Sequence, residues 1–255
     1  MQTQLRLIRC LFLDAAAAVG LPRIVAAEAT DGNDRVDGQC DPILLLLEFF
    51  DGVTPPVLPT GWSSTTWVTS NSGVPTPPAD TPPNAAFVDD PATISDKQLL
   101  SPNMDSICDA GAVQVSFRNN FDLQDGFDGG VLKVSYDDGL TFQDVLVVGT
   151  FVLGGYNGTI NSCCGNPLAG RQAWTGNSGG FIDSTVSLPE GCIHQIILRR
   201  RMGSDSSVSG EGWRIDNVAI TQCPEFLPRP RDRPTPRPRP TPHPRPDGAV
   251  MKDDS

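Results

Sequence analysis

The stretch Val113-Gln114-Val115-Ser116-Phe117-Arg118 decides the fold class, and Leu132-Lys133-Val134-Ser135-Tyr136 repeats its pattern. In both stretches apolar and polar residues alternate with a period of two, as in a β-strand that buries one face. The second stretch continues through Asp137-Asp138-Gly139, and an Asp-Gly step supplies the positive φ angles of a tight hairpin turn. A further strand over residues 141–148 would complete that hairpin. The sequence therefore predicts antiparallel β-structure.

Further strands are expected on both sides of this hairpin. Residues 43–50 are apolar on both faces, so we expect a strand in the middle of a sheet. The chain has 25 Gly and 24 Pro, which favours short strands joined by many loops and leaves little room for helix. The other predicted strands are 85–88, 98–100, 181–188, 193–200 and 213–220. We predict an all-β, two-sheet antiparallel jelly-roll sandwich over residues 43–223.

Two proline-rich segments interrupt or follow this domain. Residues 53–91 are dense in Pro, Thr, Ser and Asn, and we expect a long surface excursion because Pro lacks the donor of a sheet ladder. In residues 228–246 Pro recurs at almost every second position, which favours extended polyproline II without a core. We therefore predict a disordered Pro/Arg-rich tail over residues 224–255, acting as a stiff spacer or attracting acidic polymers through its arginines.

The charge distribution excludes one class of partner. The formal net charge is −11, and residues 228–246 contribute +5, so the rest of the chain is near −16. A nucleic-acid-binding domain needs clustered Lys and Arg to neutralise phosphates. We therefore expect no nucleic-acid partner.

The N-terminal segment resembles a secretory signal. Arg6 and Arg9 precede an apolar stretch, which Asp14 interrupts, and Ala27-Glu28-Ala29 offers the small residues of a cleavage site. We predict a signal peptide over residues 1–29 and a leader segment over residues 30–42. The apolar run 43–47 is too short to span a bilayer, so the expected location is secreted or cell-surface.

Cysteine usage agrees with export. Cys10 lies in the predicted signal, which leaves an even number of cysteines for disulfides. Spacing alone does not fix the pairing. Cys40 and Cys223 bracket the strand-rich region and are the favoured pair, while the adjacent Cys163 and Cys164 are expected to bond to different partners. The six predicted disulfide cysteines are Cys40, Cys108, Cys163, Cys164, Cys192 and Cys223.

Catalytic and zinc sites have little support. The only histidines are His194, which opens an apolar strand, and His243, which lies in the tail. A nucleophile–histidine system would have to use one of them, and no CxxC pair accompanies them to bind zinc. The aspartates are scattered, and no sequence rule places two of them at a glycosidase spacing. We predict no enzyme activity and no catalytic residues.

Several blocks resemble a known family in order and content. They are residues 50–56, 58–62, 82–87, 127–132, 154–158, 166–171 and 212–218. Together they resemble the MAM-like jelly-roll accessory domain of secreted bacterial proteins, as found beside the catalytic domain of immune inhibitor A type metalloproteases. The resemblance implies an accessory unit. Those proteases bind zinc through HExxH, which this chain lacks, and Cys163-Cys164 stands where a polar loop is expected.

A calcium site is predicted from buried carboxylates. Asp216 shares a strand face with Val218 and Ile220, and Glu48 shares one with its apolar neighbours, so both should be at least partly buried. A buried charge costs several kcal/mol, on the order of 5, unless a cation pairs with it. Related jelly-roll modules place a structural calcium between the first strand and the Asp of the last, which implies Glu48 and Asp216 as ligands with Asp51 as a third. The alternative is ion pairing with Arg118, Arg199, Arg200 or Arg214.

Binding or adhesion is the predicted function. Exposed Trp and Tyr rings can stack on sugars, and the candidates are Trp62, Trp67, Tyr156 and Trp174. The expected partner is an extracellular glycan or protein, bound by a monomer without a membrane span. Two alternatives stay open: a structural spacer domain of a cell-surface protein, and an accessory fragment of a larger secreted hydrolase (metallopeptidase) that lacks its catalytic domain.

Overall fold

A computed structural model describes residues 41–106, 111–189 and 195–223. These residues belong to the first of two compact units, Met1–Glu225. The predicted signal peptide 1–29, most of the leader 30–42 and the tail 224–255 lie outside the described residues. So do His194, His243, Cys40, Cys108 and Cys192.

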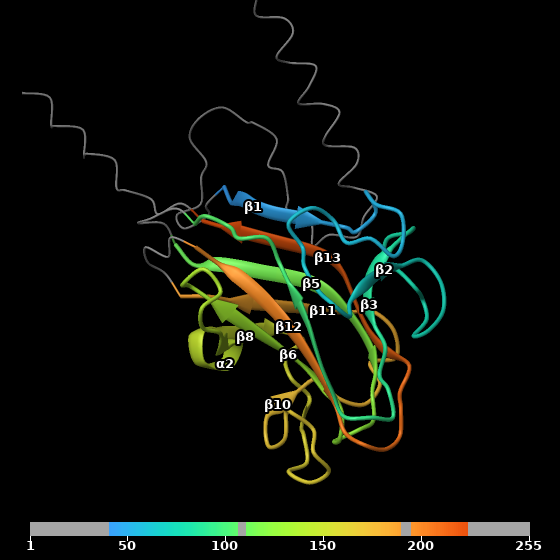
Figure 1. Cartoon of the computed structure of the whole chain (residues 1–255). Helices are drawn as coiled ribbons and strands as arrows, with labels where there is room; N and C mark the ends of the chain where they lie inside the picture. The colour runs from blue at the N-terminus through green and yellow to red at the C-terminus, as the bar shows by residue number, and fades with distance from the viewer. Residues whose placement is uncertain (1–40, 107–110, 190–194, 224–255) are drawn as a thin grey trace, which may run out of the picture. The chain divides into compact units, whose positions relative to one another are not determined.

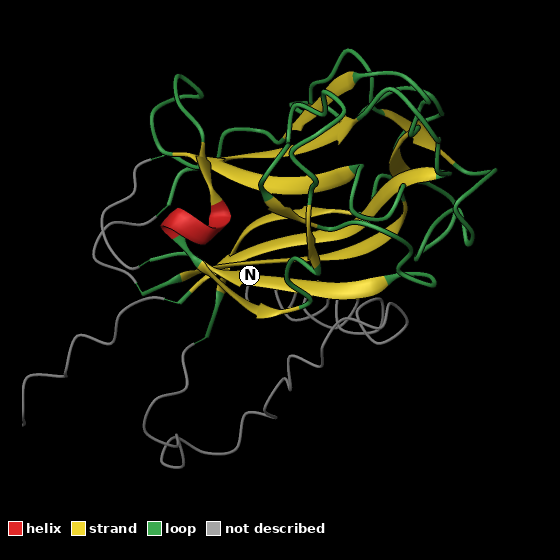
Figure 2. Ribbon diagram, turned by 90° about the horizontal axis from the view of Figure 1, so that it is seen from below, coloured by secondary structure: helices red, strands yellow, loops and turns green. Residues whose placement is uncertain are grey.

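Two antiparallel sheets face each other across a hydrophobic core (Figures 1 and 2). The larger sheet runs in the order β2-β3-β13-β5-β11-β8, and β1 also pairs with β13. Its strands are β1 (Ile43–Glu48), β2 (Val68–Ser70), β3 (Ala85–Val88), β5 (Val113–Asp122), β8 (Thr150–Leu153), β11 (Ile182–Ser187) and β13 (Gly212–Gln222). The predicted two-sheet all-β sandwich is confirmed.

The smaller sheet runs in the order β4-β12-β6-β7. Its strands are β4 (Ser95–Leu100), β6 (Gly129–Ser135), β7 (Gln143–Asp144) and β12 (Ile197–Ser204). A two-stranded ribbon of β9 (Gly158–Thr159) and β10 (Gln172–Ala173) and one helical turn, α2 (Val145–Val148), complete the described elements.

Aromatic rings fill the space between the sheets. Trp213 of β13 lies 5.1 Å from Trp67 and 5.8 Å from Trp174 between ring centroids, and Trp174 contacts Phe117 at 5.8 Å. The inward-facing Arg200 of β12 is fully buried, with its guanidinium 4.8 Å from the Phe117 ring centroid. The alternation that predicted β5 and β6 thus reflects one face packed on this core.

Two predicted strands differ from the structure. β1 was expected in the middle of a sheet, but among the described strands it pairs only with β13, and Leu44 and Leu47 are 55 % and 40 % exposed. Over residues 141–148 the strand ends at Asp144, because the Asp144 side chain accepts a hydrogen bond from Leu146 N and caps α2. The positive φ angles expected at the Asp-Gly step are confirmed, at 57° for Asp138 and 81° for Gly139, but the hairpin is not tight, because residues 135–142 separate the paired residues Val134 and Gln143.

The predicted surface excursion 53–91 is fastened to the sandwich more closely than expected. It contributes β2 and β3 to the larger sheet. The buried Arg214 of β13 donates to the carbonyl oxygens of Pro75 at 3.0 Å and Pro78 at 2.9 Å, and also to those of Ser72 and Val74. The proline-rich segment supplies these carbonyls because Pro removes donors while leaving acceptors.

Candidate functional site

Four basic side chains gather on the smaller sheet. The residues Leu198, Arg200 and Met202 of β12 are buried, so the alternate residues Arg199 and Arg201 point to the opposite, outer face.

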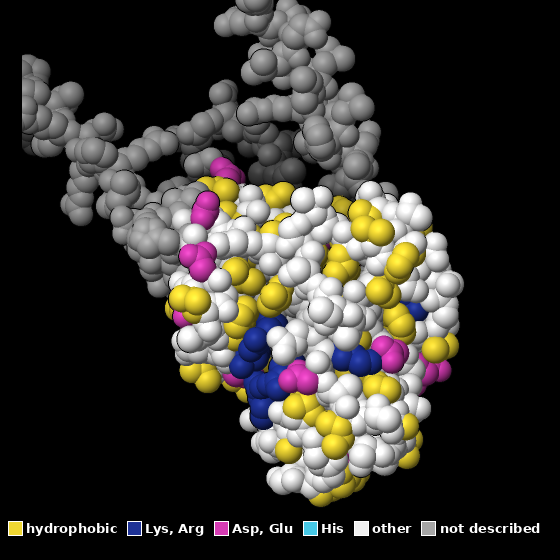
Figure 3. Space-filling model, viewed as in Figure 1, with side chains coloured by type: hydrophobic (Ala, Val, Ile, Leu, Met, Phe, Trp, Pro, Cys, Tyr) yellow, Lys and Arg dark blue, Asp and Glu magenta, His cyan; other side chains and the backbone are white. Residues whose placement is uncertain are grey.

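Lys133 of β6 stands directly opposite Arg199 in the strand register, and Arg171 precedes β10. Figure 3 shows Lys and Arg side chains grouped on this side of the molecule. We call Lys133, Arg171, Arg199 and Arg201 the basic face.

Two of these four cations have carboxylate partners. Arg201 forms a two-bond pair with Asp96, in which Nε donates to Oδ1 and Nη2 to Oδ2, each at 2.7 Å. Arg171 pairs with Asp144. Both partners lie on the same sheet, in β4 and β7.

The other two cations form no ion pair with any residue that the structure describes. Arg199 donates through Nη1 to Gln98 Oε1 at 3.2 Å, and its guanidinium carbon lies 3.9 Å from the Phe142 ring centroid. These contacts orient the guanidinium without neutralising it. Lys133 stands beside it, and directly opposite Asp144 of β7 in the strand register.

The positive charges of the basic face affect one another's pKa values. Burial lowers the pKa of Lys133, and the charges of Arg199, Arg171 and Arg201 lower it further, while the charge of Asp144 raises it. Burial and the charge of Arg201 lower the pKa of Arg199 in the same way. The pKa of Arg201 is instead raised, mainly by its hydrogen bonds to Asp96. An anion bound between Lys133 and Arg199 would relieve this repulsion.

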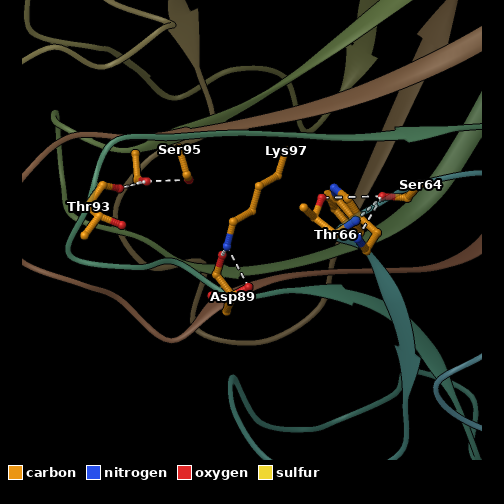
Figure 4. A network of polar contacts seen from close by, with 8 residues as sticks. Ser64, Thr66, Asp89, Thr93, Ser95 and Lys97 are labelled. Carbon is orange, nitrogen blue, oxygen red and sulfur yellow. Dashed lines mark hydrogen bonds and ion pairs between the residues drawn. The ribbon is translucent and has the colours of Figure 1, made fainter.

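The remaining Lys and Arg of the described part are engaged elsewhere. Lys97 donates to the Asp89 carboxylate at 2.6 Å and to the Asp89 carbonyl at 3.0 Å (Figure 4). Arg118 pairs with Asp80 and Asp183, while Arg200 and Arg214 are buried. The described body therefore presents its uncompensated positive charge on the basic face.

The carboxylates predicted to bind calcium are held by backbone N–H groups. Asp216 Oδ2 accepts from Asp80 N at 2.8 Å and from Thr81 N at 3.0 Å, and Oδ1 accepts from Asn217 N at 2.7 Å. Asp216 is fully buried, and Glu48 is half-buried, as the alternation predicted.

Glu48 and Asp51 are bound similarly. Glu48 Oε1 accepts from Phe50 N at 2.7 Å, and Asp51 Oδ1 accepts from Asn84 N at 2.9 Å. The alternative expectation, an ion pair between Asp216 and an arginine, is not seen among the described residues.

These three carboxylates nevertheless interact with one another. Burial raises the pKa of Asp216 to about 7, and the charge of Asp51 adds to this rise and to the rise at Glu48. Burial also raises the pKa of Asp51. Within the described ranges, however, no three His, Cys, Asp or Glu side chains are placed to hold a metal ion together.

Three of the four predicted sugar-stacking rings are core residues. Trp62, Trp67 and Trp174 are 6 %, 2 % and 0 % exposed. Tyr156 packs against Trp174 at 4.8 Å between ring centroids, and its hydroxyl bonds to both backbone groups of Leu132. The prediction of Trp62, Trp67 and Trp174 as parts of a ligand platform was wrong, because an enclosed ring cannot stack on an external sugar. Tyr156 is only partly buried, and its role stays a prediction.

The cysteine prediction needs one correction. Cys163 and Cys164 form a disulfide with each other, not with different partners. Their Cα atoms are 3.8 Å apart, which is the spacing of adjacent residues. Cys223 is also disulfide-bonded. The favoured Cys40–Cys223 pairing stays a prediction, because Cys40 lies outside the described residues.

Sequence reasoning missed the basic face although its signal was present. Arg199 lies in the predicted strand 193–200 and Arg201 directly follows it, so a strand continued by one residue would place both on one face. Their pairing with Lys133 of β6 depends on the strand register, which a single sequence does not provide.

Comparisons with known proteins identify no family. No family model matches the sequence, and no curated protein matches it. Among solved structures, the carbohydrate-binding module TmCBM61 in complex with β-1,4-galactotriose is 13 % identical, covering 64 % of this chain and 89 % of that chain with a TM-score of 0.41.

The K1 cleaved adhesin domain of Lys-gingipain from Porphyromonas gingivalis W83 is 16 % identical, with 69 % and 96 % coverage and a TM-score of 0.41. The K2 domain of Lys-gingipain is 18 % identical, with the same coverage and a TM-score of 0.39. Because these TM-scores are below 0.5, the likenesses say nothing about the ligand of this chain. No helix in the described part is long and apolar enough to cross a membrane.

Proposed function

We propose that the domain is a non-catalytic binding module that holds an acidic extracellular glycan on the basic face. The observation that supports it is the pair Lys133 and Arg199, two adjacent cations without a carboxylate partner in the described body. Burial is the main cause of the lowered pKa of both groups, and neighbouring arginine charges lower the two pKa values further. An anion bound between the two cations would remove the repulsion between them, and this gain in free energy would contribute to the binding affinity.

The geometry suits a carboxylated or sulfated sugar. A guanidinium offers a planar fork that matches carboxylate and sulfate oxygens, and Arg199 is already oriented by Gln98 and Phe142. An amide group such as that of Gln98 can bond to the hydroxyl groups of the same sugar. The rest of the described chain is rich in acidic residues and would repel an extended anion. The negative charges of the ligand must therefore lie in a short stretch that fits the basic face.

The test is binding of the full chain to a broad glycan array that includes uronic-acid and sulfated sugars. Lys133→Gln and Arg199→Gln should each weaken binding, and added salt should weaken it in the wild type. Asp96→Asn is the matched control with the opposite expected effect. It removes a negative charge that competes with the ligand, so it should strengthen binding. Absence of binding to every acidic glycan would refute the proposal and favour the spacer alternative. Preferential binding of DNA or RNA would also refute it.

The calcium site predicted at Glu48, Asp51 and Asp216 is a second part of the proposal. It is supported by Asn84, whose backbone N–H donates to Asp51 and whose buried side-chain Oδ1 lacks a partner among the described residues. Calcium prefers such amide and carboxylate oxygens. The chain would supply Glu48, Asp51, Asp216 and Asn84, and the ion would fasten β1 to β13.

Thermal unfolding in calcium and in chelator tests this site. At 100 times its dissociation constant, calcium should add about 2.7 kcal/mol to the free energy of unfolding. Asp216→Asn keeps the shape of the side chain and should reduce that gain. Identical melting of the wild type in calcium and chelator would rule the site out.

A further inference from the structure

A disulfide between adjacent residues lies in the loop that joins β9 to β10, which projects beyond the strands of the sandwich (Figure 1). The two ends of the loop are joined by backbone bonds. Ile160 N donates to Arg171 O at 2.9 Å, and Gly170 N donates to Ile160 O at 2.8 Å. Cys163 and Cys164, which form the disulfide, are both exposed. A reagent in solvent can therefore reach this pair.

The loop is held in place by contacts that do not involve the disulfide. Asn166 is buried, and its Nδ2 donates to Phe127 O at 2.6 Å and to Gly203 O at 2.9 Å. Ile160 and Leu168 are buried in one small hydrophobic cluster. These anchors lie on both sides of the cysteine pair in the sequence, so the loop should keep its place on the sandwich when the disulfide opens.

A disulfide between neighbouring residues also contributes little to the stability of the fold. A disulfide stabilises mainly by restricting the unfolded chain, and the effect grows with the number of residues in the closed loop. Cys163 and Cys164 close the shortest loop that two residues can form. The other five cysteines stand at least 30 positions from one another, so any disulfide among them closes a long loop. Stability therefore does not account for the Cys163–Cys164 bond.

The backbone at the disulfide favours its opening. Cys164 has a φ angle of 72°, in the left-handed region that residues with a Cβ rarely adopt. Gly165, which follows it, has a φ angle of 83°, and glycine adopts that conformation freely. Cys164 is tied to Cys163 by the disulfide, whereas the reduced residue is free to return to a more common backbone conformation.

We propose that the Cys163–Cys164 disulfide is a thiol-exchange site, which an external dithiol reduces while the fold stays intact. One thiolate of the dithiol attacks a sulfur of the pair, the S–S bond breaks, and the released cysteine thiolate takes up a proton. The second thiolate of the dithiol then displaces the other cysteine and closes a disulfide within the reagent. In total, two electrons and two protons pass from the dithiol to the cysteine pair. The exchange uses no residue of the basic face or of the proposed calcium site.

The experiment is reduction of the full chain under native conditions, followed by alkylation and peptide mapping by mass spectrometry. The oxidised protein is incubated with increasing dithiothreitol and then with iodoacetamide. Cys163 and Cys164 should be alkylated at about tenfold lower dithiothreitol concentration than Cys223, which is also disulfide-bonded but half-buried. Reduction of the pair should change Tm by at most about 3 °C, and oxidised glutathione should restore the bond.

The double variant Cys163→Ser and Cys164→Ser is the matched control, because it lacks the disulfide and nearly keeps the size of both side chains. It should melt within about 3 °C of the wild type. The proposal is overturned if the pair resists reduction until Cys223 is also reduced, or if the fold is lost when the pair opens or when the double variant is made. It is also overturned if peptide mapping of the oxidised protein links Cys163 and Cys164 to other cysteines.

Discussion

Replacing Arg214 with Met should loosen the proline-rich segment from the larger sheet. The guanidinium donates to four carbonyl oxygens, but those of the exposed residues Ser72 and Val74 can regain water in the variant. The bonds to Pro75, which is buried, and Pro78, which is half-buried, are lost outright. Hydrogen bonds from a charged donor contribute about 1.5–3 kcal/mol each.

Two such bonds give about 3–6 kcal/mol, and relief from burying the charge reduces the net loss to about 3 kcal/mol. For a domain of this size, Tm should fall by roughly 6–12 °C. Differential scanning calorimetry measures the fall, and limited proteolysis should cut within residues 72–84 faster than in the wild type. Arg199→Met is the matched control, because Arg199 is only half-buried and should shift Tm by a few degrees at most. If Arg214→Met melts at the same temperature as the wild type and is cut at the same rate, Arg214 does not hold the proline-rich segment on the larger sheet.

Two further predictions concern the core and its buried acids. In chelator, stability should fall as pH rises from about 4 to 7, because the folded state holds protons on Asp216 and Asp90, whose pKa is raised to about 7, after the unfolded state has lost them. Asp216→Asn should flatten this slope in denaturant titrations, and an unchanged slope would contradict the assignment. Gly130→Ala should destabilise the domain by about 1–3 kcal/mol, since the added Cβ would lie 2.6 Å from the Trp213 ring. Unfolding of Gly130→Ala at the wild-type denaturant midpoint would show that this ring can move aside.

Much of the fold could be predicted because alternation reports directly on one buried face. The predictions of β5 and β6 follow from that pattern, whereas β13 is buried on both faces over Gly212–Val218. β1 shows the limit, because an apolar run on both faces is typical of a central strand, yet here it marks an exposed edge. Its place depends on β13, whose other half pairs with β3 on the same side. Two strands thus share one edge of β13, and this arrangement depends on tertiary structure that the pattern of a single strand does not report.

The candidate sites were harder to predict than the strands. Burial of Asp216 was foreseen, but its partners are N–H groups of residues 80 and 81, far away in the sequence. Trp62 and Trp174 could be either ligand platforms or core, since composition does not distinguish an exposed ring from a buried one.

The most direct test of the central claim compares a charged sugar with its neutral ester. Isothermal titration calorimetry would measure binding of oligogalacturonate and of its neutral methyl ester to the full chain. We expect the charged sugar to bind and the ester not to bind, and each of Lys133→Gln and Arg199→Gln to weaken binding about tenfold. Equal affinity for the two sugars, or undiminished affinity in both variants, would contradict a ligand site on the basic face.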